Sequence, residues 1–298
     1  MHRTGSTWFQ KSILDGRDGR PVNAIDDRAE STARIVLPRD LDYEPETTRA
    51  WVLDRLAESE NRGHAPVISN ERFSGNPASG WHDAERTATR LAGLMPDARV
   101  MLVVREQTSL LESMWLQQIR IGGISGIEDF LRPAERGDHR LPVPDARFLE
   151  FHRFVAFLDD LFGSDDVLVL PFELLRADPS AYLERIESFS GIAFPPPADN
   201  RPVYAAPSFL EVAVLRRVNL LTTRSSLHRA PPLPHLEPAG RRFARMIGRT
   251  ATASGEARRR GRARKAITRS LEAIDFRTSN RLLAERMGID LEGLGWRA

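Results

Sequence analysis

The sequence predicts an α/β fold in which helices flank a central parallel sheet, followed by a helical C-terminal portion. As far as residue 192, short apolar runs alternate with amphipathic stretches, and the strongest run, RVMLVV over 99–104, is apolar as buried parallel strands are. This alternation favours a parallel sheet with helices on both faces. The turn-rich stretch FPPPADNRPV (194–203) ends it, and only helical patterns follow. We therefore expect one domain over 1–298, with an α/β core over 1–200 and a helical portion over 201–298.

Hydrophobic periodicity places the individual elements along the chain. Asp178-Pro179 is typical of a helix start, and Gly191 of a helix end. The expected strands cover 65–70, 99–104 and 166–173. The expected helices cover 6–14, 46–59, 83–95, 107–119, 148–161, 178–192, 207–222, 238–248, 257–275 and 278–287.

Composition excludes several classes of protein. The chain has no cysteine, which excludes a disulfide scaffold, thiolate metal sites and thiol catalysis. It contains no run of 18 apolar residues and no signal peptide with an apolar core, and we expect a cytoplasmic protein. All but two of the 43 basic residues are arginine, the exceptions being Lys11 and Lys265. Arginine suits phosphate and sulfate groups, but a GC-rich coding sequence is the better explanation of a bias over the whole chain.

The opening stretch RTGSTW (3–8) resembles a loop that leads into a helix and binds an anion. Gly5 allows a ligand to approach the backbone closely, Ser6 and Thr7 add hydroxyl donors, and Arg3 adds a full positive charge. An unoccupied Ser/Thr helix cap is the alternative interpretation. The stretch lacks the lysine of the NTPase loop, so the nucleotide and Mg²⁺ site of that class is not predicted.

A second candidate site follows the strand at 99–104. Arg105 comes directly after that strand, and Ser113 follows eight residues later on the next predicted helix. Because ligands of open parallel sheets bind at the carboxyl ends of the strands, both side chains could reach one phosphate. Alternatively, Arg105 makes a salt bridge at the helix start and Ser113 lies on the surface.

The order of these parts resembles the sulfotransferases that use 3′-phosphoadenosine-5′-phosphosulfate (PAPS), which have a P-loop NTPase-like fold. The matching stretches are RTGSTW (3–8), VVREQTSLLESMW (103–115) and VLPFELLRADPSAYLERIESFSGI (169–192). The tail SNRLLAERMGIDLEGLGW (279–296) also resembles the end of bacterial, carbohydrate-type members. Together these stretches span nearly the whole chain, and their order and spacing are more specific than any one of them.

The resemblance implies roles for particular residues. The 5′-phosphosulfate would be held by Arg3, Thr4, Gly5, Ser6, Thr7 and Trp8. Arg105 and Ser113 would hold the 3′-phosphate, which distinguishes PAPS from ordinary adenine nucleotides. Glu173 resembles the acidic residue that follows the third strand in this family, and we interpret it as structural. PAPS would be the co-substrate, and no metal is expected.

Sulfuryl transfer to a hydroxyl or amine also needs a base that takes the acceptor's proton. The family places a His or Glu just after the second strand, and here the stretch VISNERFSG (67–75) supplies Glu71. We therefore expect Glu71 as the base and Arg3 as the group that stabilises the leaving phosphate. A salt bridge from Glu71 to Arg72 is the alternative interpretation, and His82 is the reserve candidate.

Other functions stay open at this point. A nucleotide-dependent kinase is one, although the missing lysine counts against it, and a catalytically inactive, sulfotransferase-like binding protein is another. The basic run EARRRGRARK (256–265) fits a solvated helix face best, then a contact with the nucleotide or an acidic acceptor, and nucleic acid least. The expected acceptor is a carbohydrate, a glycolipid or a small molecule, bound by loops such as 121–147 and 224–240.

The position of the loop raises one more expectation. Loops of this kind follow a buried strand, and in the PAPS-dependent family that strand lies in the middle of the sheet. Only Met1 and His2 precede Arg3 in this sequence. We therefore expect the first strand to be truncated and the natural protein to carry further upstream residues.

Overall fold

The computed structural model describes residues 4–17, 20–77, 80–131, 146–192, 194, 207–223, 232–272 and 274–297. The chain divides into two compact units. The first contains residues 1–106, 139–203 and 275–298, and the second contains residues 107–138 and 204–274. The portion expected to be helical, 201–298, therefore contributes to both units, because its last helix belongs to the first unit.

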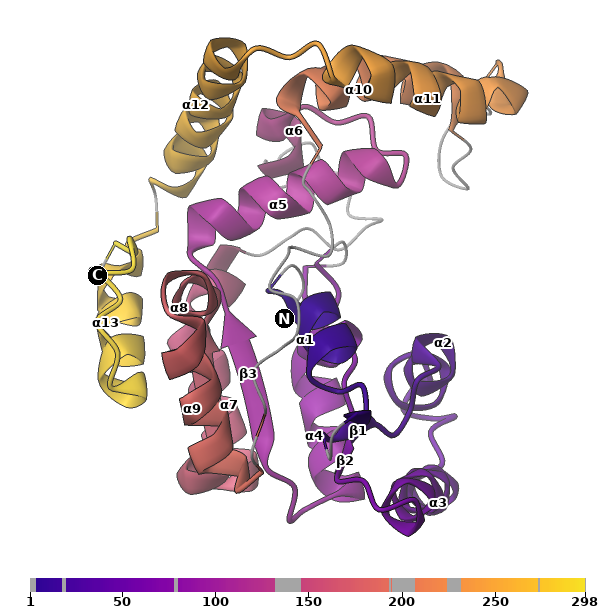
Figure 1. Cartoon of the computed structure of the whole chain (residues 1–298), viewed down its shortest axis with the longest axis vertical. Helices are drawn as coiled ribbons and strands as arrows, with labels where there is room; N and C mark the ends of the chain where they lie inside the picture. Colours follow the sequence, from indigo (N-terminus) through magenta and orange to yellow (C-terminus); the bar gives the residue numbers. More distant parts are fainter. Residues whose placement is uncertain are drawn as a thin grey trace. The chain divides into compact units, whose positions relative to one another are not determined.

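Among its described residues, the first unit has two small parallel sheets of two strands each (Figure 1). In one, β1 (Val22–Asn23) pairs with β2 (Pro66–Val67). In the other, β3 (Val100–Val104) pairs with β4 (Val167–Pro171) over five residues in register. The parallel pairing of β3 and β4 confirms the predicted strand direction.

A single central sheet is not found within the described residues. An apolar cavity of about 480 Å³ is lined by residues of both β2 and β3, and each of these strands pairs only within its own sheet. The prediction of an α/β fold thus holds for the parallel strand pairs, whereas the fold as a whole is mostly helical.

Helices make up most of the first unit, and several begin or end as their sequences predict. Asp178 accepts a hydrogen bond from the amide of Ala181, and Gly191 ends that helix in the left-handed conformation. The helices are α1 (Ser6–Ser12), α2 (Arg28–Ser31), α3 (Pro45–Asn61), α4 (Ala84–Leu94), α7 (Phe151–Phe162), α8 (Phe172–Ala177), α9 (Pro179–Ser190) and α13 (Phe276–Met287).

The core that positions α1 is formed by residues distant in sequence. Phe9 and Ile13 of α1 pack in one cluster with Leu170 of β4 and Tyr182 of α9. Burial of each such side chain contributes about 1.5–3 kcal/mol. This packing fixes the start of α1 beside the carboxyl end of β4.

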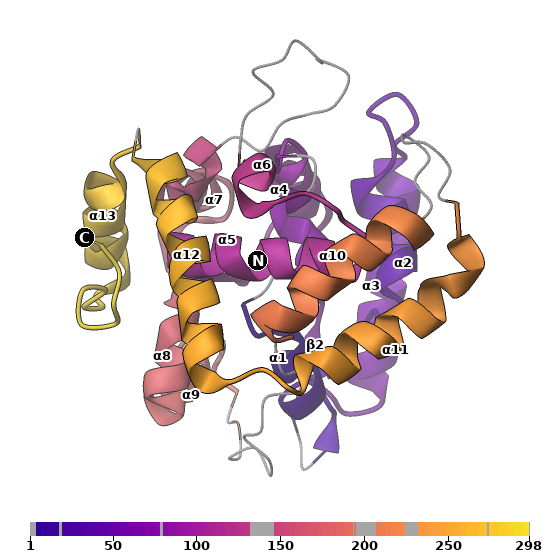
Figure 2. The same ribbon diagram turned by 90° about the horizontal axis from the view of Figure 1, so that it is seen from above.

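The second unit is entirely helical among its described residues. It comprises α5 (Gln107–Arg120), α6 (Ile127–Leu131), α10 (Phe209–Thr222), α11 (Glu237–Gly248) and α12 (Ala253–Leu271). Trp115 and Ile119 of α5 pack with Val212 and Leu215 of α10 and with Ala244 of α11. Figure 2 shows α10 and α11 lying side by side.

Sequence periodicity misses the short elements. β1, α2 and α6 were not predicted, and each has five residues or fewer. The strand expected over 166–173 ends at Pro171, and α8 begins at Phe172. Proline has no N–H to continue a strand ladder, which explains why the strand stops there.

Candidate functional site

The Thr-Gly-Ser turn has the conformation that its glycine predicts. Gly5 adopts φ +81°, in the left-handed region, and immediately precedes α1. A Cβ atom at this position would lie 3.0 Å from Cε2 of Phe172 and 3.3 Å from Cδ2 of Leu175. Thr4 is buried, and Ser6 and Thr7 form the first turn of α1, where backbone N–H groups have no partner within the helix.

A side-chain contact joins α1 to the segment after β2. Nε2 of Gln10 donates to the carbonyl oxygen of Ser69 at 2.9 Å and to its hydroxyl oxygen at 3.0 Å. Arg28 also donates to Oε1 of Gln10. Helix α1 and the segment that carries Glu71 are therefore held together by direct hydrogen bonds.

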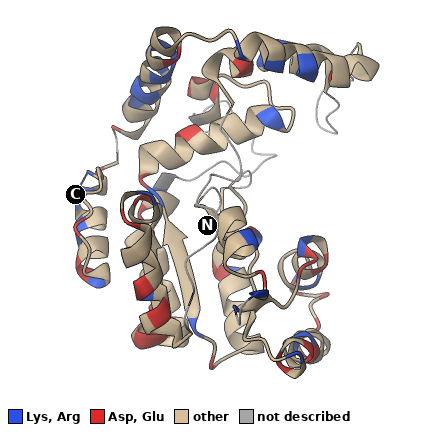
Figure 3. Cartoon of the chain, in the orientation of Figure 1, with Lys and Arg blue, Asp and Glu red and all other residues tan. Residues whose placement is uncertain are grey.

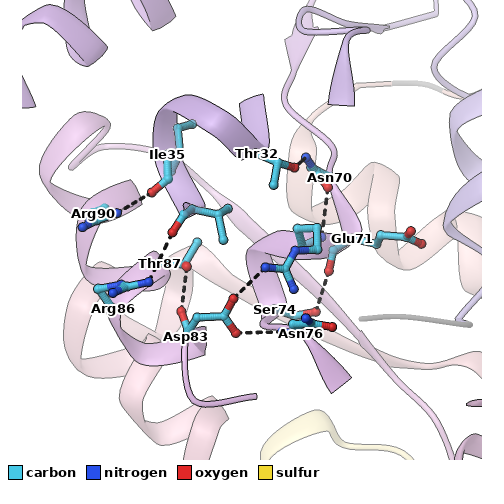
Figure 4. Close-up of polar contacts among 12 residues, drawn as sticks. Thr32, Ile35, Asn70, Glu71, Ser74, Asn76, Asp83, Arg86, Thr87 and Arg90 are labelled. Atoms are coloured by element: carbon cyan, nitrogen blue, oxygen red, sulfur yellow. Dashed lines mark hydrogen bonds and ion pairs between the residues drawn. The ribbon is translucent and has the colours of Figure 1, made fainter. Parts of the chain in front are cut away.

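Glu71 begins a single 3₁₀ turn, Glu71–Ser74, whose start is fixed by Asn70. The side-chain oxygen of Asn70 accepts from the amide of Arg72 at 2.9 Å, and its amide group donates to Oγ of Ser31 at 2.8 Å and Oγ1 of Thr32 at 3.0 Å. Oγ of Ser74 donates to the carbonyl oxygen of Glu71. This network, shown in Figure 4, fixes the backbone from which the Glu71 side chain projects.

The salt bridge from Glu71 to Arg72 that the sequence left open is not formed. Arg72 binds Asp83 instead, at 2.9 Å, and the other carboxylate oxygen of Asp83 accepts from the amide of Asn76 at 2.8 Å. Figure 4 shows the Glu71 carboxylate pointing away from Asp83.

The anion-type turn and the segment that carries Glu71, both predicted from the sequence as parts of the site, line the same cavity. Thr4, Gly5 and Ser6 line it from one side, and Ser69, Asn70 and Glu71 line it as well. The rest of the lining is largely apolar and includes side chains of β2, β3, α4, α7 and α9. His82, the reserve base, is exposed and is not among the residues that line this cavity.

Arg105 follows β3 and stacks on an aromatic ring, with Cζ 5.0 Å from the ring centre of Phe172. Phe172 is also the side chain that Gly5 approaches. Both the anion-loop candidate and the phosphate-binding candidate Arg105 therefore lie beside the residue that begins α8.

Glu173 joins three segments of the first unit. Its Oε1 accepts from the amide of Glu106 at 3.3 Å, and its Oε2 accepts from Nε1 of Trp296 at 3.1 Å. Burial raises the pKa of the Glu173 carboxyl above its ordinary value, and the hydrogen bonds and nearby Arg105 only partly oppose this effect. These contacts agree with the structural role that we inferred for Glu173.

Ser113 belongs to the second unit, where its side chain is buried on α5. A pairing of Ser113 with Arg105 at one phosphate stays a prediction. The neighbouring residue Glu112 is also buried, and its two oxygens bind Nε of Arg260 and Nε of Arg264, each at 2.8 Å. Part of the basic run 256–265 is thus used to neutralise a buried carboxylate inside the second unit.

Some residues that the sequence predicts to bind ligands lie outside the described part of the structure. Arg3 lies outside the described residues, as do 132–145 and 224–231, which make up much of the loops expected to bind the acceptor. Trp8 is partly buried and packs against the cluster of Phe9 and Tyr182. Its predicted contact with the nucleotide is untested by this packing.

Two residues of the site were not found by sequence reasoning. Asn70 carries a local signal, because Asn before a short helical turn is typical of a cap. Trp296 has no local signal, since its partner Glu173 lies 123 residues away in sequence. Trp81 and Trp115 are both buried: Trp81 stacks on Phe148, and Trp115 packs in the core of the second unit.

Within the described ranges, no cluster of three or more His, Asp or Glu side chains is arranged to hold a metal ion. None of the helices in those ranges combines the length and apolar character needed to cross a membrane. In comparisons with known proteins, no family model matches the chain and no curated protein matches it.

Proposed function

We propose that this protein is a PAPS-dependent sulfotransferase that transfers the sulfuryl group to a hydroxyl or amine of a carbohydrate, glycolipid or small molecule. The observation that carries the proposal is the shared cavity. An anion-type turn, Thr4–Ser6, and a carboxylate, Glu71, line it together although they are 65 residues apart in sequence. A site for sulfuryl transfer needs both groups, one for the phosphosulfate and one for the acceptor's proton.

The reaction is an in-line displacement at sulfur. The acceptor oxygen or nitrogen forms a bond to sulfur while the bond from sulfur to the bridging oxygen of the 5′-phosphate breaks. Glu71 takes the acceptor's proton, and the electron pair of the broken bond leaves with the nucleotide as 3′-phosphoadenosine-5′-phosphate (PAP). Donors from Ser6, Thr7 and Arg3 stabilise the charge that grows on the leaving phosphate.

Nucleotide selectivity resides with Arg105 and Ser113 in this proposal. The guanidinium of Arg105 is held against the ring of Phe172, which reduces the rotamer freedom that binding would otherwise remove. An Arg paired with a phosphate is a strong, charge-assisted contact. We further propose that the two strand pairs of the first unit are parts of a P-loop-like sheet, as in the family that the sequence resembles.

The proposal is tested by calorimetric binding of PAP, 5′-AMP and ATP to the full chain, with Arg105→Ala and Ser113→Ala as variants. We expect PAP to bind more tightly than 5′-AMP. Loss of a charge-assisted hydrogen bond of about 1.5–3 kcal/mol should weaken PAP binding by about tenfold to a hundredfold in Arg105→Ala. Arg277→Ala, an exposed arginine on α13, serves as the control for general loss of charge.

Other results would favour a different function for this protein. Equal affinity for PAP and 5′-AMP in the folded wild type would contradict the proposal. Preference for ATP with Mg²⁺-dependent turnover would favour the kinase. PAP binding without transfer to any of a broad panel of acceptors would favour an inactive, sulfotransferase-like binding protein.

A further inference from the structure

One helix of the second unit exposes large apolar side chains. Phe243 and Met246 of α11 are 50% and 56% exposed, and Leu236, directly before the helix, is 42% exposed. The spacing of Phe243 and Met246 places them on the same side of the helix. Two large apolar side chains exposed on adjacent turns form a feature that a solvated helix does not need.

The same exposed face is basic. Arg242, Arg245 and Arg249 are all exposed, and with Met246 they follow the i, i+3, i+4, i+7 spacing of one helical stripe. Figure 3 shows Lys and Arg positions along α11 and α12. The only acidic residue of α11 is Glu237, which pairs with Arg241 at 2.9 Å on the other side of the helix.

The opposite face of α11 is fixed against the rest of the unit. Ala244 is buried in the core with Val212 and Leu215. Gly240 and Gly248 allow close approach, because a Cβ atom at these positions would lie 2.4 Å from Val218 and 2.6 Å from Glu211 of α10. The helix therefore cannot turn its apolar residues inward without losing this packing.

We propose that this exposed face, Arg242, Phe243, Arg245, Met246 and Arg249, binds the surface of an anionic lipid bilayer. Lipid phosphates offer the bidentate acceptors that arginine prefers, and the layer beneath them accepts apolar side chains. A nucleic acid would use the arginines but leave Phe243 and Met246 in water. An apolar protein surface would bury those two but leave the arginines without counter-charges. Of these three partners, the bilayer is the one that satisfies both kinds of side chain.

The test is co-sedimentation of the full chain with vesicles of phosphatidylcholine alone and of phosphatidylcholine with phosphatidylglycerol. The informative variant is Phe243→Ser/Met246→Ser, which keeps every charge. A second variant is Arg242→Gln/Arg245→Gln/Arg249→Gln. Its matched control is Arg258→Gln/Arg262→Gln/Arg269→Gln on α12, which removes the same charge from exposed positions. Equal circular dichroism melting curves would show that all variants fold.

We expect the wild type and the α12 control to bind the phosphatidylglycerol vesicles, and both α11 variants to bind at least about tenfold more weakly. Wild-type binding by Phe243→Ser/Met246→Ser would overturn the proposal, because charge alone would then explain adsorption. Absence of vesicle binding by the wild type would overturn it as well. So would tight binding of duplex DNA that is unchanged in Phe243→Ser/Met246→Ser, since the face would then be a polyanion site.

Discussion

At the scale of single residues, the account depends on Glu71 and the short network that positions it. Asn70 fixes the turn at its start, and the Arg72–Asp83 pair holds the neighbouring side chain away from Glu71. A general base must reach the acceptor's proton. The fixed backbone at Glu71, and the pairing of Arg72 with Asp83 rather than with Glu71, therefore favour Glu71 as the base.

Replacing Glu71 by Gln tests the role directly. Glu71→Gln should lower kcat for sulfuryl transfer by about 10²–10⁴-fold, because a general base contributes that much. Its PAP affinity should stay within about twofold of wild type, since the base contacts the acceptor rather than the nucleotide. Glu85→Gln, an exposed carboxylate of α4, should behave as wild type. An unchanged kcat in Glu71→Gln would exclude the residue as the base.

Gly5 offers a second residue-scale prediction. Gly5→Ala should weaken PAP binding and lower Tm, because the residue has φ +81° and its Cβ would press on Phe172. Gly63→Ala is the matched control: its φ is +80°, but no atom lies within 4 Å of the added Cβ. Both variants should lose about 1–2 kcal/mol of stability from the backbone conformation alone. Only Gly5→Ala should lose affinity, and equal PAP binding in the two variants would contradict a ligand role for the turn.

At the scale of elements, the junction between β4 and α8 connects the site to the end of the chain. Phe172 contacts the Gly5 turn and Arg105, and Glu173 binds the segment after β3 and Trp296. One short helix, α8, thus positions both halves of the proposed nucleotide site.

Burial of Glu173 predicts a pH dependence of stability. Its pKa is raised in the folded state above the ordinary value of 4.5, so the unfolded chain loses this proton at a lower pH than the folded chain does. The stabilising contribution is complete below pH 4.5 and is lost as pH rises through the folded pKa. The glutamine side chain of Glu173→Gln cannot ionise, so this variant should not lose stability in that way as pH rises. Urea unfolding between about pH 4 and 8 should show wild-type stability falling relative to Glu173→Gln, and a pH-independent difference would contradict the prediction.

Elements with strong periodicity were predicted from sequence, and contacts across long separations were not. The helix starting at Asp178-Pro179 and ending at Gly191 was predicted because its caps are local signals. The contact of Glu173 with Trp296 and the ion pairs of Glu112 with Arg260 and Arg264 depend on the tertiary fold. In the candidate site, Gly5 was predicted from the Gly-Ser-Thr turn that precedes a helix, and Glu71 from its place just after the second expected strand.

At the scale of the whole molecule, the sequence predicted parallel strands, but it did not predict their division into two separate pairs or the cavity lined by β2 and β3. Val67 and Met101 line that cavity, and the Thr4–Ser6 turn lines it too, on the helix that packs beside the carboxyl end of β4.

The most direct measurement of the central claim is the transfer reaction itself, with PAPS carrying ³⁵S and a panel of phenol, amine, sugar and glycolipid acceptors. The account predicts that label moves from PAPS to an acceptor without added metal ions, and that Glu71→Gln abolishes most of this transfer while retaining PAP binding. Failure to transfer label from PAPS, together with Mg²⁺-dependent transfer from γ-labelled ATP to the same acceptors, would contradict it.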